Sequence, residues 1–170
     1  YNIIVLNFRN PSVGNAWNPL SIPFEYYKKG DMDKAAEFAN DIASNLMRAE
    51  NSSNDPFWDY SASDLMFGLM MLLFRYAVDH KKTNEFVNIA SLIELRRTLF
   101  ATNKRAKDTM MWKYAAEDEI ISASLSGSIY APNDTMNSIL SVFDQKMRTF
   151  TIQPTLLNML ACNNIDIDLV

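Results

Sequence analysis

Apolar side chains recur every three or four positions over most of this sequence, which is the spacing of an α-helix with one buried face. One helix is predicted from Asp31 or Asp33 to about residue 50, and the clearest amphipathic helix begins at Asn133 or Asp134. The apolar positions on one face of that second helix are Met136, Ile139, Leu140, Phe143, Met147 and Phe150. The pattern predicts a mainly α-helical protein.

The most apolar segment lies between these two helices. Asp55 and Pro56 are a capping residue and a proline suited to the first helical position, and they open a helix that runs to about His80. Its longest apolar run, from Leu65 to Phe74, is half the length of about 20 residues that a membrane span needs. We therefore expect this helix to be buried inside a globular core.

Shorter helices complete the pattern. They are predicted over residues 24–29, 85–100, 108–127 and 154–161. Gly30 suits the C-terminal end of the first of these helices, because glycine adopts the left-handed conformation that often follows a helix. Pro154 suits the first position of the last one.

The two ends of the chain differ from this helical body. Ile3, Ile4, Val5 and Leu6 form a β-branched apolar run, and apolar residues alternate with acids from Ile165 onward, so short strands are predicted over residues 1–8 and 165–170. A lone strand cannot satisfy its backbone within a helical body. We therefore expect residues 1–170 to be a single domain, a multi-helix, bundle-like insertion with short terminal strands that belong to a sheet in a neighbouring domain.

Composition narrows the function classes. The 170 residues are 48% hydrophobic, which is enough for a core of ordinary size. The net charge of −4 disfavours a protein that wraps nucleic acid over its whole surface. With Cys162 as the one cysteine and His80 as the one histidine, no metal site and no internal disulfide are expected, and the cytosol is the default compartment.

No catalytic or cofactor-binding residue is predicted. A P-loop needs a glycine followed directly by Lys and then Ser or Thr, and none of the four glycines stands in that context. Consecutive acids at 117–119 fan out around a helix instead of converging, and Asp64 is expected to be paired or facing solvent. The ten methionines are interpreted as core filling, with an adaptable partner groove as the alternative.

Positive charge is concentrated in the middle of the chain. Eight basic and three acidic residues lie between Lys81 and Lys113, whereas the rest of the chain is strongly acidic. The candidate partner-binding residues within this segment are Arg96, Arg97, Lys104, Arg105, Lys107 and Lys113. They are predicted to dock an acidic protein or a nucleic-acid backbone; a solvated helix face is the alternative. Trp112 and Tyr114 flank Lys113 but point about 100° apart from it on a helix, so no base-stacking platform is expected.

Two stretches resemble a known family. The first is Asn10-Pro11 followed by Trp17-Asn18-Pro19-Leu20, directly after the predicted N-terminal strand. The second is Asp55-Pro56-Phe57-Trp58, followed by Ser61-Ala62 and Asp64-Leu65, at the start of the long apolar helix. Together they resemble the coupling proteins of type IV secretion and conjugation, the TraG/TraD class of hexameric DNA-pumping ATPases.

The resemblance implies a fold and a role. In that family an all-alpha domain is inserted into a RecA-like ATPase domain and faces the cytoplasm, and the family's membrane anchor is not expected within these residues. The Walker A and Walker B motifs are also missing, so the resemblance implies a non-enzymatic fragment of an ATPase. Its implied partners are relaxosome or secreted substrate proteins, DNA, the parent ATPase domain and neighbouring subunits. The implied role is recognition of substrate or relaxosome proteins by docking. The alternatives are direct DNA binding and a structural insertion that supports hexamer packing.

Overall fold

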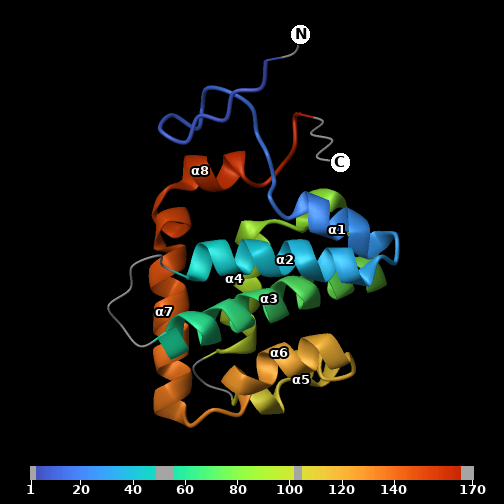
Figure 1. Cartoon of the computed structure of the whole chain (residues 1–170), viewed down its shortest axis with the longest axis vertical. Helices are drawn as coiled ribbons and strands as arrows, with labels where there is room; N and C mark the ends of the chain where they lie inside the picture. Colours follow the sequence, from blue (N-terminus) through green and yellow to red (C-terminus); the bar gives the residue numbers. More distant parts are fainter. Residues whose placement is uncertain (1–2, 49–55, 102–104, 166–170) are drawn as a thin grey trace.

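The computed structural model describes residues 3–48, 56–101 and 105–165. The described chain is mainly helical, as predicted, with eight α-helices and two short 3₁₀ turns (Figure 1). In chain order they are α1 (Ser21–Lys28), α2 (Met32–Met47), α3 (Pro56–Asp79), η1 (Asn84–Phe86), α4 (Ile89–Leu99), η2 (Ala106–Asp108), α5 (Met110–Ala115), α6 (Glu119–Ile129), α7 (Asn133–Ile152) and α8 (Pro154–Met159).

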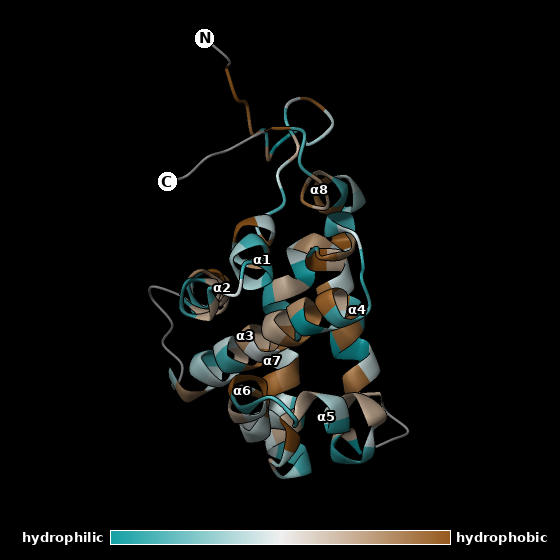
Figure 2. Ribbon diagram, turned by 90° about the vertical axis from the view of Figure 1, so that its right-hand side faces the viewer, coloured by the Kyte–Doolittle hydropathy of each residue, from teal (hydrophilic) through white to brown (hydrophobic). Residues whose placement is uncertain are grey.

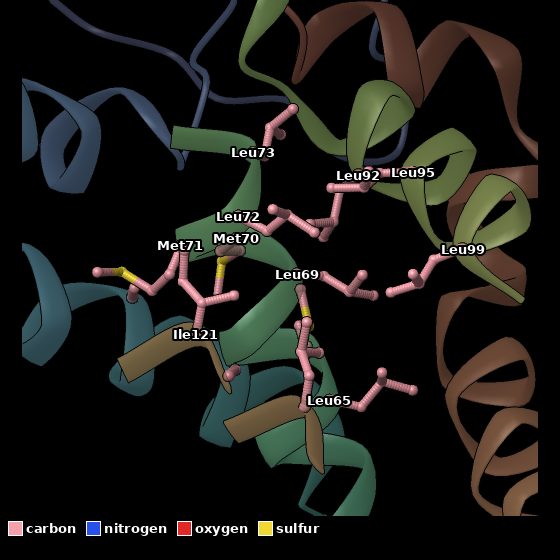
Figure 3. Close-up of a cluster of buried hydrophobic side chains, with 14 of the residues drawn as sticks. Leu65, Leu69, Met70, Met71, Leu72, Leu73, Leu92, Leu95, Leu99 and Ile121 are labelled. Carbon is pink, nitrogen blue, oxygen red and sulfur yellow. The ribbon is translucent and has the colours of Figure 1, made fainter. Parts of the chain in front are cut away.

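Helix α3 is the centre of the core. It packs against α2, α4, α6 and α7, and its side chains from Leu69 to Phe74 are almost completely buried (Figure 3). By length and composition it is the one helix among the described residues that could cross a membrane, but 67% of its most apolar 18-residue window is buried within the protein. The predicted buried helix is confirmed. The methionines of α3, Met66, Met70 and Met71, fill this core.

Local sequence signals set the first helix boundaries. Gly30, with φ of +80°, follows α1, and the Asp31 side chain accepts a hydrogen bond from the Lys34 amide to cap α2. Pro56 and Pro154 are the first residues of α3 and α8. The predicted boundaries at Gly30, Asp31 and Pro154 are confirmed, because each depends only on residues within one turn. The predicted cap of α3, Asp55, lies outside the described residues.

The helix predicted over residues 108–127 is divided into α5 and α6. Asp118 has φ −106° and ψ 127°, outside the helical region, and its carboxylate accepts a hydrogen bond from the Ile121 amide. An aspartate that satisfies a free helix-start amide favours a new helix over continuation of the old one. Likewise α4 begins at Ile89 instead of near residue 85, because Asn88 caps it through the Ser91 amide.

The predicted N-terminal strand is not formed over residues 3–8, the part of it that the structure describes. Residues 3–7 have no regular secondary structure, and Ile3, Ile4 and Val5 are exposed. Within the described chain, Val5 hydrogen-bonds only with Asn15, through the Asn15 backbone and side chain. A β-branched run needs a neighbouring strand to satisfy its backbone, and the helical body offers none. The other predicted strand, residues 165–170, lies beyond the described residues except for Ile165, which is in a bend.

The two ends of the described chain meet at one end of the molecule (Figures 1 and 2). The Trp17 amide donates to the Met159 carbonyl at 3.0 Å, and the Asn164 amide donates to the Ala16 carbonyl at 3.2 Å. Asn163 and Asn164 accept from the backbone amides of Asn18 and Ala16 through their side chains. We call this contact between residues 15–18 and 159–164 the seam.

Candidate docking surface

The predicted basic patch is divided by the fold. Arg96, on α4, forms an ion pair with Asp144 of α7, and its side chain is only 14% exposed. That arginine therefore joins two helices instead of facing a partner. Arg97 is 62% exposed and lies 3.7 Å from Glu94, one turn away on the same helix, so it has a weak, solvent-exposed ion-pair partner.

The remaining predicted cations lie around η2 and α5. Arg105, Lys107 and Lys113 are exposed, and no described acid pairs with them; Asp108 is the exposed acid between them in sequence. Lys104 lies outside the described residues. Three of the six predicted residues therefore present charge to solvent on one short stretch of chain.

This stretch lies far from the seam. Helices α5 and α6 form one end of the molecule, and α8 and the seam form the other, in both the view of Figure 1 and the perpendicular view of Figure 2. The long helix α7 connects the two ends. The exposed cations are therefore at the end that is free of chain termini.

Two apolar side chains at this end of the molecule are also exposed, and neither was predicted from the sequence. Met110, the first residue of α5, is 76% exposed, and Tyr130, directly after α6, is 62% exposed. The Tyr130 hydroxyl accepts a hydrogen bond of 3.2 Å from the indole of Trp112, and the two rings meet edge to face at 5.7 Å. The contact holds Tyr130 beside α5. Only the tertiary structure shows that these two side chains remain uncovered.

We use the name far surface for five exposed side chains at the α5–α6 end of the molecule: Arg105, Lys107, Met110, Lys113 and Tyr130. Met110 and Lys113 are three residues apart on α5 and so share a face of that helix. Helix α5 begins where the Thr109 hydroxyl accepts a hydrogen bond from the Trp112 amide. Trp112 itself is 4% exposed, so its ring does not face solvent at this surface.

A separate polar cluster joins α3 to α5. The Arg75 guanidinium stacks on the Tyr114 ring at 4.2 Å and donates to the Tyr114 carbonyl at 2.7 Å and to Glu117 at 2.8 Å. The Tyr114 hydroxyl donates to Asp79. Of the three consecutive acids, Glu117 thus pairs with Arg75 while Asp118 caps α6, so they diverge as predicted. This cluster holds α3 against α5 and the residues that follow it.

Burial and nearby acids perturb two tyrosines in this region. Burial, with added repulsion from Asp118 and Asp79, raises the pKa of Tyr27 to about 12. Burial and the hydrogen bond to Asp79 also raise the pKa of Tyr114 above its usual value. Both groups therefore stay neutral in the folded protein at pH values where an unfolded chain would ionise them.

We expect Tyr27→Phe to change the alkaline stability profile. A tyrosine whose folded pKa is raised contributes stability that is complete below pH 10 and is lost as the pH rises from 10 towards 12. The free energy of unfolding of the wild type should fall more steeply in this window than that of the variant, as measured by urea denaturation at several pH values. Parallel curves would contradict the raised pKa of Tyr27.

The other candidate groups do not assemble into a site. Asp64 is exposed, as predicted. Partial burial raises its pKa, and the positive charge of Arg48 lowers it by a smaller amount. Cys162 is exposed, and His80 lies against the Tyr76 ring at 4.2 Å. Within the described ranges no three His, Cys, Asp or Glu side chains come together as metal ligands.

Comparison with known proteins identifies the family. No curated protein and no solved structure matches the chain. A family model described as type IV secretory system conjugative DNA transfer matches residues 1–169. That match spans nearly the whole sequence, including the two stretches on which the resemblance to coupling proteins depends. The chain therefore belongs to the type IV secretory system conjugative DNA transfer family.

Proposed function

We propose that this chain is the recognition domain of a conjugative coupling protein and that it docks a protein of the transfer machinery, either a relaxosome component or a secreted substrate. The proposal depends on one observation: the seam and the exposed basic surface lie at opposite ends of the molecule. A domain tethered at one end presents the opposite end to partners.

The seam supports an insertion in a larger protein. Its hydrogen bonds place the entry and exit of the helical body side by side, so the body can be added to a neighbouring domain with little disturbance of that domain. The exposed apolar residues 3–5, which have no strand to pair with in the described chain, fit an attachment to a sheet elsewhere. We place that neighbouring ATPase domain on the cytoplasmic side of the membrane-associated machinery.

The proposed mechanism is tethering, not catalysis. The sequence has no P-loop, and its one cysteine and one histidine are 82 positions apart. A partner held on the far surface is kept near the motor at a high effective concentration, which speeds delivery without any chemical step in this domain. No cofactor is needed for that role.

The test is DNA transfer in cells that express the protein with Arg105, Lys107 and Lys113 changed to Glu. We expect transfer frequency to fall by about tenfold or more, because charge complementarity governs encounter and specificity at such surfaces. Assembly of the oligomeric coupling protein, measured by cross-linking, should be unchanged. A matched control changes Lys29, Lys81 and Arg148, which are exposed elsewhere, to Glu; its transfer frequency should match the wild type.

Two results would contradict docking at this surface. Loss of assembly in the first variant would favour a structural role in hexamer packing. An unchanged transfer frequency with assembly intact would show that these cations bind no essential partner.

A further inference from the structure

We infer that the far surface binds an acidic peptide segment that also carries apolar side chains, with the cations holding its carboxylates and with Met110 and Tyr130 contacting its apolar groups. This inference rests on the proposed docking function and narrows it to one partner chemistry.

The exposed cations of the far surface favour a partner segment that is acidic. Arg105, Lys107 and Lys113 are exposed and have no ion-pair partner among the described residues, whereas Arg96 and Arg75 are committed to Asp144 and Glu117. Residues 105–113 carry these three cations and one acid, Asp108, for a net charge of +2, whereas the chain as a whole carries −4. An acidic segment would be attracted here and repelled from most of the other surface.

The apolar side chains select a peptide over a nucleic acid. Met110, at 76% exposure, makes a flexible apolar contact, and Tyr130 presents a ring that its bond to Trp112 holds in place. Aromatic residues, Met and Arg are the types enriched at the centres of protein interfaces. Single-stranded DNA binding needs successive exposed rings for stacking, and Tyr130 is the one exposed ring of the far surface, since Trp112 is buried.

The experiment is a selection of random 16-residue peptides displayed on phage against the purified 170-residue chain. Selected peptides should combine several Asp or Glu residues with aromatic or Leu residues. Their affinity, measured by fluorescence anisotropy with synthetic peptides, should fall at least tenfold for the R105E/K107E/K113E variant. It should also fall severalfold for Met110→Ser and Tyr130→Ser, and be unchanged for the K29E/K81E/R148E control. Circular dichroism of each variant verifies that it is folded.

Labelled 30-nucleotide single-stranded and duplex DNA serve as the competing probes at 50 and 200 mM salt. DNA binding that is tighter than peptide binding, falls steeply with salt and is unaffected by Met110→Ser would overturn the inference in favour of phosphate recognition. Neutral or basic selected peptides, or acidic ones that bind the charge-reversed variant equally well, would also overturn it. If transfer in cells still depends on these cations, docking itself stands and only the partner chemistry is wrong.

Discussion

Replacing Asn18 with leucine is expected to lower the free energy of unfolding by about 3 kcal/mol, because two buried backbone groups lose their partners and each costs roughly 1–3 kcal/mol. Asn18 is 3% exposed, and its side-chain amide donates to the Val87 carbonyl at 2.6 Å. Its side-chain oxygen accepts from the Leu20 amide at 3.0 Å. Val87 and Leu20 are completely buried, so water cannot replace the lost bonds.

Urea denaturation of the purified chain measures this effect, and Asn45→Leu is the matched control. Asn45 is exposed on α2 and donates only to the Asp41 carbonyl one turn earlier, so its replacement should change the stability by less than about 0.5 kcal/mol. Equal effects of the two substitutions would show that Asn18 does not join the seam to the α3–α4 connection in the way the structure indicates.

The second large effect is a contrast between two helical glycines. A methyl group on Gly68 of α3 would lie 2.7 Å from two side-chain carbons of the buried Leu125 and 3.1 Å from Ser124, both on α6. Overpacking of this kind costs about 1–3 kcal/mol, more than the roughly 1 kcal/mol that alanine gains over glycine in a helix. We therefore expect Gly68→Ala to destabilise the protein.

Gly127, on α6, provides the opposite case. It has no atom within 4 Å of an added methyl group, so Gly127→Ala should raise the free energy of unfolding by about 1 kcal/mol. The two variants should move the denaturation midpoint in opposite directions and differ by about 2 kcal/mol, given the same two contributions. A stabilised Gly68→Ala protein would mean that α3 and α6 are not in the close contact seen here.

Both substitutions lie in contacts that connect to the seam or to the far surface, so a loss of stability could also change function. Asn18 belongs to the seam, and Gly68 sets the close approach of α3 to α6, which ends beside Tyr130 on the far surface. Stability changes at these sites should therefore be measured before any transfer defect of the same variants is assigned to lost binding.

The predictions from the sequence were most accurate for features that depend on residues close together in the chain. Helix class, the buried α3, the Gly30 and Asp31 boundary and the prolines that open α3 and α8 each follow from periodicity or from contacts within one turn. It failed where two local signals compete, as at Asp118, which interrupts an otherwise continuous helical pattern. It also failed for residues 3–7, because a strand depends on a partner that no local pattern supplies.

For the candidate site, the sequence predicted which segment carries the positive charge but not which of its side chains are free. The sequence by itself established the concentration of positive charge between Lys81 and Lys113 and the motifs that resemble coupling proteins. Only the tertiary structure decided that Arg96 pairs with Asp144 from α7, 48 positions away, while Arg105, Lys107 and Lys113 stay exposed at the same end of the molecule as Met110 and Tyr130. The physical reason is that charge and periodicity are properties of short segments, whereas pairing and exposure depend on which distant helices pack together.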